Sequence, residues 1–412
     1  MNPLVKSQNI RTKKSALSKA LFVTFSSLLI SACLLGEEDD AETTQLNVTE
    51  EVIEENDADS TQLNETEDVF EENDAETTQL NGTEKVFMFT SDYNSGELHS
   101  LNLVTKDVSA GISFHQDSKL RTDGEHLWVL ERLGADNLVK LPLDFSSAKD
   151  IVFQKSLPDN SNPVDIKFYN QNIAYVSLQN ANKLLQINPK DGSTKKVIDV
   201  SDYAYDKTQF ANTAQMTLSN DSLFVLVQGM NGYSTGNKGI VLLIDAKTGT
   251  ITKEYELPLK NPTSIIKQGQ KLIISMEGEY LGDLSAADKS RGILSLDITT
   301  GISETLFTDI DLEGTPHNLK SVDNKLFVQV KQGYDDSWNS IIKLVELDTD
   351  AQTSQLVSVK AQGGGIAWSN LSSQWIVGQR VGGSEAILLV DDKKKIVDED
   401  MLPPYDILIV GE

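Results

Sequence analysis

Residues 239–249 read Gly239-Ile-Val-Leu-Leu-Ile-Asp245-Ala-Lys-Thr-Gly249, an apolar run that leads directly into a tight turn. The five residues between Gly239 and Asp245 are all apolar, which is typical of a strand buried on both faces between two neighbouring sheets. Asp245 opens the turn, and Gly249 takes the positive-φ position that other residues avoid. The same turn returns as Asn188-Pro-Lys-Asp-Gly192 and Asp297-Ile-Thr-Thr-Gly301. This stretch therefore predicts a repeated β unit.

A second apolar strand defines the size of the repeat. It occurs seven times at intervals of 41 to 54 residues, as Val86-Phe-Met-Phe, Leu127-Trp-Val-Leu, Ile173-Ala-Tyr-Val, Leu223-Phe-Val-Leu, Leu272-Ile-Ile-Ser, Leu326-Phe-Val-Gln and Trp375-Ile-Val-Gly. A shorter strand begins seven residues before five of them, at Leu120, Ile166, Met216, Ile265 and Leu319. Such spacing is that of a four-stranded propeller blade. We predict an all-β domain over residues 85–412, a seven-bladed β-propeller of four-stranded antiparallel blades.

The two ends of this domain complement each other. The chain ends Pro404-Tyr-Asp-Ile-Leu-Ile-Val410, which has the pattern of an innermost strand with no later strands after it. Val86, in contrast, begins as a second strand with no first strand before it. We predict that both ends share one blade, because closing the ring removes the exposed sheet edges of an open stack.

The units 163–192 and 262–301 resemble the YVTN-type propeller repeats of bacterial surface and periplasmic proteins. The resemblance covers most of residues 86–412, and its motifs are specific for fold and poor for function. Lipid-anchored members of this broad group include surface proteins that capture corrinoids or siderophores beside an outer-membrane transporter. The resemblance thus implies a lipoprotein that captures a substrate.

The N-terminus has the pattern of an export signal. Five basic residues and no acidic ones precede the apolar run 20–30, which is too short for a comfortable membrane span. The run ends Leu29-Ile30-Ser31-Ala32-Cys33, which resembles a bacterial lipobox. That resemblance implies a signal peptide over residues 1–32 and a diacylglycerol on Cys33, the single cysteine; an ordinary signal peptide is the alternative. In Gram-negative lipoproteins an aspartate after the lipidated cysteine favours the inner membrane, so the resemblance, with Leu34 at that position, implies an outer-membrane location within the cell envelope.

Residues 33–84 have a composition unlike the rest. Nineteen acidic residues and no basic ones occur here, within three near-identical segments that start at Asp40, Asp57 and Asp74. A segment with this many charges cannot bury a hydrophobic core, and we therefore predict an extended acidic linker. The alternative is that the acidic repeats bind Ca²⁺ or a cationic partner. The formal charge of the whole chain is −26, which argues against a nucleic-acid partner.

One polar position of the innermost strands is expected at the mouth of the central channel. It is occupied by Lys119, Asp165, Gln215, Ser264, Asn318, Gly365 and Asp406. Such a ring suits a ligand, although any wet channel mouth favours polar residues. Of the four histidines, only His317 falls near this ring.

The connections between second and third strands should open on the same face. Three of them are long, residues 228–238, 277–291 and 331–340, and they carry Tyr233, Tyr280, Tyr334 and Trp338 together with Gln228, Asn231 and Gln332. Shorter equivalents carry Tyr93, Arg132, Gln179 and Arg380, and a further aromatic loop covers residues 203–210. Aromatic side chains beside amides and charges suit a large polar ligand or a protein partner. Tight turns serve the opposite face, so we predict that the loop-rich face is the binding face.

Three functions are compatible with these residues. We expect first a membrane-anchored binding protein, monomeric and without cofactor or metal, that captures a large polar small molecule or an envelope protein. The second is a structural scaffold, because Leu243-Ile-Asp-Ala-Lys-Thr-Gly249 resembles the blade motif of the propeller lipoprotein in outer-membrane assembly, although the tryptophan that usually follows is missing. The third is a propeller lyase or lactonase, which needs a clustered metal site for which Asp165 and Glu277 are candidates. No phosphate-binding glycine loop or H-E-x-x-H motif supports catalysis.

The lipid anchor gives the first prediction. Replacing Cys33 by alanine removes the one thiol that can carry the lipid, so the Cys33→Ala protein should leave the membrane fraction on ultracentrifugation. A variant that still sediments with membranes would show that Cys33 is not the anchor.

Overall fold

The computed structural model describes residues 84–232, 234–279, 290–334, 340–380, 386–389, 394–396 and 401–411. The chain divides into two units, Met1–Glu76 and Thr77–Glu412, and all described residues belong to the second. The predicted signal peptide, Cys33 and the acidic repeats lie outside the described residues. In the part of the chain that is described, no helix has the length and hydropathy that a membrane crossing requires.

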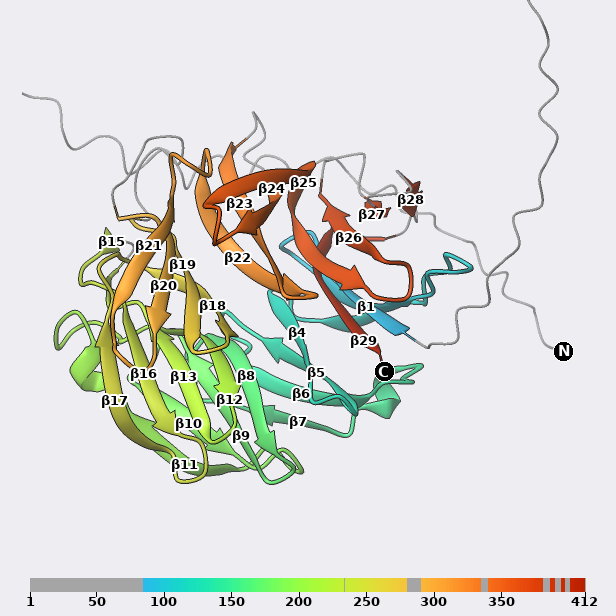
Figure 1. The fold of residues 1–412 in the computed structure, drawn as a ribbon. Helices are drawn as coiled ribbons and strands as arrows, with labels where there is room; N and C mark the ends of the chain where they lie inside the picture. The colour runs from blue at the N-terminus through green and yellow to red at the C-terminus, as the bar shows by residue number, and fades with distance from the viewer. Residues whose placement is uncertain are drawn as a thin grey trace, which may run out of the picture. The chain divides into compact units, whose positions relative to one another are not determined.

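The second unit is a ring of seven four-stranded antiparallel sheets (Figure 1). Blade 1 consists of β29 (Pro404–Gly411), β1 (Glu84–Ser91), β2 (Gly96–Leu101) and β3 (Ile112–Phe114). Blade 2 contains β4 (Ser118–Thr122), β5 (His126–Glu131), β6 (Asn137–Pro142) and β7 (Phe153–Ser156). Blade 3 contains β8 (Pro163–Asn170), β9 (Ile173–Leu178), β10 (Lys183–Ile187) and β11 (Thr194–Asp199).

Blade 4 contains β12 (Thr213–Ser219), β13 (Ser222–Val227), β16 (Ile240–Asp245) and β17 (Thr250–Glu256). Blade 5 contains β18 (Pro262–Gln268), β19 (Lys271–Met276), β20 (Gly292–Asp297) and β21 (Ser303–Thr308). Blade 6 contains β22 (Thr315–Val322), β23 (Lys325–Tyr334), β24 (Ser340–Asp348) and the first part of β25 (Thr353–Ser369). The rest of β25 starts blade 7, which continues with β26 (Gln374–Gln379), β27 (Ala386–Leu389) and β28 (Lys394–Ile396). The predicted seven-bladed propeller is confirmed.

The core lies between the blades. Seven apolar clusters are present in the described residues, one for each pair of neighbouring blades around the ring. Alternate side chains of one strand serve two of them: Phe87 and Phe89 of β1 pack toward blade 2, and Val86 and Met88 pack toward blade 7. Each fully buried side chain of this size contributes roughly 1.5–3 kcal/mol of transfer free energy. This is why the second strands are apolar on both faces.

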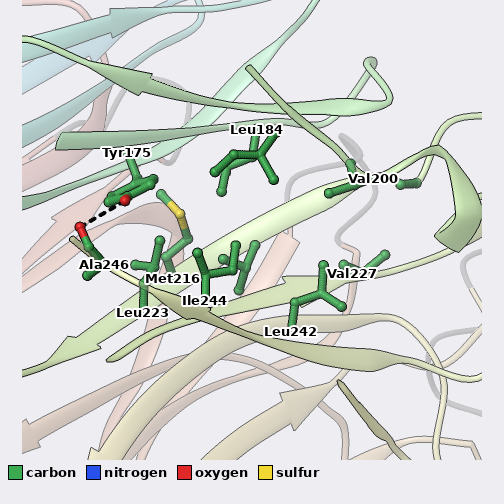
Figure 2. Packing of buried hydrophobic residues seen from close by; sticks show 12 residues of the cluster. Tyr175, Leu184, Val200, Met216, Leu223, Val227, Leu242, Ile244 and Ala246 are labelled. Atoms are coloured by element: carbon green, nitrogen blue, oxygen red, sulfur yellow. Dashed lines mark hydrogen bonds between the residues drawn. The ribbon is translucent and has the colours of Figure 1, made fainter. Parts of the chain in front are cut away.

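The interface between blades 3 and 4 shows how polar groups fit into this core (Figure 2). Tyr175 of β9 packs against Met216 and Ile244 of blade 4. Its hydroxyl donates to the carbonyl oxygen of Ala246 at 2.8 Å and accepts from the amide of Gln186 at 2.8 Å. The buried hydroxyl is therefore satisfied, and it ties the two blades together.

The ring closes as predicted. The last strand β29 pairs antiparallel with β1, with Val86 opposite Ile409 and Met88 opposite Ile407, and both strands lie side by side in Figure 1. Glu84, at the start of β1, adds a second link to blade 7. Its carboxylate accepts hydrogen bonds from the backbone N–H groups of residues 370 and 371, at 2.6 and 3.1 Å.

Two of the loops on the predicted binding face contain more β structure than we expected. The loop at residues 228–238 contains a short hairpin of β14 (Met230–Asn231) and β15 (Ser234–Thr235). The predicted loop 331–340 is partly strand, because β23 continues to Tyr334 and pairs there with the start of β24 at Ser340. Outside the strands, the described residues contain only the short 3₁₀ turns η1 (Ala148–Asp150) and η2 (Ser201–Tyr203) as helical structure.

The closing strand gives the second prediction. A chain that ends at residue 402 lacks β29, so the edge of β1 and the apolar side chains of blades 1 and 7 lose their partner. We expect aggregation on size-exclusion chromatography. A milder variant, Ile407→Ala, should lower the free energy of unfolding in urea by about 2–5 kcal/mol, because Ile407 is only 4% exposed. The matched change Ile302→Ala, at a residue that is 70% exposed, should cost less than about 0.5 kcal/mol. A truncated chain that stays monomeric and unfolds cooperatively would contradict closure by β29.

Candidate functional site

The central channel contains a cavity of about 570 Å³. Its wall comes from the innermost strands of blades 1 to 6 and from the residues that follow several second strands. The predicted site residues that line it are Lys119, Asp165, Gln215, Asn318 and Asp406 of the ring, with His317, Arg132, Gln179 and Gln228. Gly365 lies elsewhere, packed so closely on the backbone of Asp406 and Ile407 that a Cβ would clash.

A recurrent backbone irregularity shapes the channel mouth. Six of the seven innermost strands have a register shift within their first residues, and β4 alone pairs regularly. A bulge of this kind adds a residue to one strand and redirects the neighbouring side chains. In blade 6 the extra residue is His317, between Pro316 and Asn318, and its side chain lines the cavity.

Three residues of the predicted ring join neighbouring blades. Each accepts a hydrogen bond from a backbone N–H of the next innermost strand: Asp406 Oδ2 from Leu120 (2.9 Å), Asp165 Oδ2 from Met216 (3.0 Å) and Ser264 Oγ from Leu319 (3.1 Å). These N–H groups lie on the channel edge of a sheet, where no further strand is available to accept them. Asp406, Asp165 and Ser264 are therefore part of the framework of the channel.

Asp165 is the most strongly held of these groups. Its side chain is 1% exposed and lies 2.6 Å from Arg121 Nε and 3.4 Å from Lys167 Nζ. Burial by itself would raise the pKa of Asp165, but the charges of Lys167 and Arg121 outweigh burial and hold this pKa below its usual value. Arg121 also lies 3.9 Å from Asp406, so one guanidinium links carboxylates of blades 1 and 3.

A second polar cluster lies at the junction of blades 5 and 6. Glu277 follows β19. Its carboxylate accepts a hydrogen bond from Nδ1 of His317 and forms an ion pair with Lys331, whose Nζ lies at 3.2 Å. Burial favours a raised pKa for Glu277, but the charge of Lys331 and the interactions with His317 lower it. Burial, with the Lys331 charge, also lowers the pKa of His317. The lowered pKa favours the neutral imidazole, and in the tautomer that donates Nδ1–H to Glu277 the other nitrogen, Nε2, is the acceptor.

Glutamine and asparagine side chains form a chain of hydrogen bonds along the rim of blades 3 to 5. Asn162 donates to Gln179 (2.8 Å), Gln179 donates to Gln228 (3.5 Å), and Gln228 donates to Asn261 (2.7 Å). The asparagines have positive φ angles of 51° and 54°, which asparagine adopts more readily than most residues. Sequence reasoning found the two glutamines but missed the asparagines, although both stand directly before the proline that starts an innermost strand.

Arg380 holds the closing blade. Its guanidinium donates to the carbonyl oxygens of Ser91, Pro403 and Pro404 at 2.9 to 3.1 Å. It also lies 4.7 Å from the ring centroid of Tyr93 and 5.3 Å from that of Tyr405. These contacts explain why Arg380 is only 8% exposed, and a direct contact of Arg380 with a ligand stays a prediction.

Several predicted binding residues cannot be placed. Tyr233, Tyr280 and Trp338 lie outside the described residues, and Tyr334 ends β23 with a side chain that is not described. The aromatic loop 203–210 does contact the hairpin loop of blade 4, where the Gly232 N–H donates to Gln209 Oε1 at 3.1 Å. Binding by the four aromatic residues therefore stays a prediction.

The sequence analysis missed three cationic residues, each of which lies two positions after a residue of the predicted ring. Arg121, Lys167 and Lys320 line the cavity from β4, β8 and β22. The side chains of a strand alternate between its two sides, so a residue two places after a channel-facing position faces the channel again. This alternation was readable in the sequence.

No group of three or more His, Cys, Asp and Glu residues within the described part of the chain could hold a metal ion. Asp165 and Glu277, which we considered as ligands of one metal, are paired instead with separate cations.

Comparison with known proteins supports the fold. No family model matches the chain, and no curated protein is significantly similar to it in sequence. Among solved structures, a putative 6-phosphogluconolactonase from Bacteroides fragilis superposes with a TM-score of 0.54 at 12% identity, over 82% of this chain and all of the other. Hydrazine synthase from Kuenenia stuttgartiensis superposes with a TM-score of 0.50 at 12% identity, over 71% of this chain and 89% of the other. Apo AztD from Citrobacter koseri gives a TM-score of 0.48 at 12% identity, over 80% and 98%. The protein is a seven-bladed β-propeller, and likenesses at this identity extend to the fold alone.

The buried carboxylate gives the third prediction. Asp165→Ala leaves Arg121 and Lys167 without their shared partner, so it should lower the free energy of unfolding in urea by about 3–5 kcal/mol. The exposed change Asp159→Ala should have no measurable effect.

The lowered pKa of Asp165 also fixes a pH dependence. The unfolded chain binds this proton at about pH 4, before the folded chain does, so the stabilisation is complete above about pH 5 and is lost as pH falls below 4. Asp165→Asn cannot titrate, so its stability should decline less steeply over that range. If the stability of the wild type and of Asp165→Asn fell equally steeply with decreasing pH, this account of the ion cluster would be contradicted.

Proposed function

We propose that this propeller is a binding protein that takes a small polar ligand into the mouth of its central channel. The observation that carries the proposal is the cavity of about 570 Å³, into which polar side chains of several blades converge. Ligand sites in proteins commonly measure 300–1,000 Å³ and hold a few placed polar groups. Gln215, Asn318 and His317 are half-buried there. Each has one protein partner, Ser264, Gln329 and Glu277 respectively, and keeps further hydrogen-bonding capacity that a ligand could use.

We further propose that the ligand is captured at the outer membrane and passed to a transporter. The lipobox-like sequence that ends at Cys33 supports an anchor, and the nineteen acidic residues that follow support an extended spacer. The channel mouth opens on the face of the connections between second and third strands, where Arg132, Gln179 and Gln228 lie. Anchored by such a spacer, the propeller would keep this face accessible to a ligand.

Acid–base chemistry on a bound ligand is a second candidate, and the pair of Glu277 and His317 favours it. A neutral imidazole that is oriented by a carboxylate is a common general base. If the ligand were converted, mass spectrometry of the protein–ligand mixture would detect a product, and His317→Gln would abolish it. An unchanged ligand leaves binding as the function.

The fourth prediction tests the binding site without knowledge of the ligand. Thr217 lines the cavity from β12, so Thr217→Trp should fill part of the channel. Thr305→Trp introduces the same side chain at an exposed position of the outer strand β21 and serves as the control. A panel of neutral, cationic and anionic metabolites is screened for compounds that raise the Tm of each protein. Hits should stabilise the wild type and Thr305→Trp but not Thr217→Trp. A panel without hits, or hits that stabilise all three proteins equally, would contradict a channel site.

A further inference from the structure

The cavity carries a charge opposite to that of the chain. Five cationic side chains line it, Lys119, Arg121, Arg132, Lys167 and Lys320, against the two carboxylates Asp165 and Asp406. Asp117 pairs with Arg132 at 3.2 Å, and counting it still leaves an excess of two positive charges. The whole chain has a formal charge of −26. Cations gathered within an acidic protein indicate a local requirement for positive charge.

Strand alternation concentrates these cations on the channel axis. Lys119 and Arg121 are two residues apart on β4, and Lys320 lies two residues after Asn318 on β22. The residues between them, Leu120 and Leu319, are buried between blades. The channel side of these strands is thus polar and cationic while their other side belongs to the core.

Two of the cations have no carboxylate partner among the described residues. Arg121 and Lys167 are paired with Asp165, and Arg132 is paired with Asp117. For Lys119 and Lys320, no carboxylate oxygen of the described residues lies within 4 Å of Nζ. Lys119 lies over the ring of Tyr405 instead, with Nζ 4.2 Å from its centroid.

The surroundings of these two lysines disfavour their charge. Burial lowers the pKa of Lys320, and the charges of Arg121, Lys167 and Lys119 lower it further, against one favourable contribution from Asp406. Burial is also the largest influence on Lys119, whose pKa is lowered although Asp406 opposes the shift. Ammonium groups held close together in a confined space are stabilised by a counter-ion. What the channel lacks is therefore negative charge.

We propose that the channel ligand is a small molecule that bears two or more carboxylate or phosphate groups, bound by Lys119 and Lys320. This inference rests on the proposed binding function and specifies its ligand class. Arg121 and Lys167, already paired, add to the positive potential, and the amides of Gln215 and Asn318 supply hydrogen-bonding groups in the same wall. A cation would meet an excess of like charge, and a neutral ligand would leave the lysines without counter-charge.

The fifth prediction concerns citrate and pyrophosphate, titrated into the full-length protein by isothermal calorimetry at low ionic strength. At least one should bind, and added NaCl should weaken it because the contact is between charges. Lys320→Gln and Lys119→Gln should each weaken binding about tenfold or more, the usual range for one charged hydrogen bond. The control is Lys267→Gln, which makes the same charge change on the innermost strand β18 at a residue that does not line the cavity.

Thermal unfolding of the same variants separates binding from folding. Because Lys320 has no carboxylate partner in the described part of the chain, Lys320→Gln should keep or raise the Tm of the protein without ligand, whereas loss of a structural residue would lower it. If neither anion binds, or if both bind with equal affinity to all three variants, the proposal of an anion site at Lys119 and Lys320 is wrong. The binding function itself would survive that result if neutral or cationic compounds stabilised the wild type but not Thr217→Trp, so the two failures are distinguishable.

Discussion

The pairing of β29 with β1 is the interaction on which the rest of the structure depends. Each blade buries both of its faces against neighbours, and the seven apolar clusters together require a ring without a gap. The last eight strand residues complete blade 1 and bring Met88 and Ile407 together between blades 1 and 7. The same strand carries Asp406, which lines the channel and accepts the N–H of Leu120. The strand that closes the ring therefore also supplies part of the channel wall.

Within the channel, some polar residues hold blades together, and others have no such structural partner among the described residues. Asp165 and Asp406 are engaged by backbone N–H groups and by Arg121, so their charge is already compensated. Lys119 and Lys320 have no comparable partner among the described residues, and they face the same cavity. A channel mouth that only needed to be wet would not require this imbalance. This excess of positive charge is the reason why we propose a ligand site there and not ordinary solvation of the axis.

Much of this could be predicted from the sequence, because the decisive signals are local. Apolar runs such as 240–244, the turns that end at glycine and the unpaired strand at each end were sufficient for the blade number and for ring closure. Alignment of the innermost strands placed five of the seven predicted ring positions on the cavity wall, whereas Ser264 and Gly365 are not among the lining residues. Lys320 could also have been predicted to face the channel, because it lies two residues after Asn318 on the same strand. Pairings between blades, such as Glu277 with His317 or Arg380 with the carbonyl of Ser91, could not be predicted, because they depend on how rigid sheets meet across large sequence separations.

If the channel binds an anionic ligand, it should also bind bromide, which tests the site most directly because the experiment requires no knowledge of the natural ligand. Crystals of the protein soaked in bromide would be measured at the bromine absorption edge. We expect anomalous peaks inside the channel beside Lys119 and Lys320, and their loss in a Lys119→Gln/Lys320→Gln protein. A map with bromide on the outer surface and none in the channel would contradict the account.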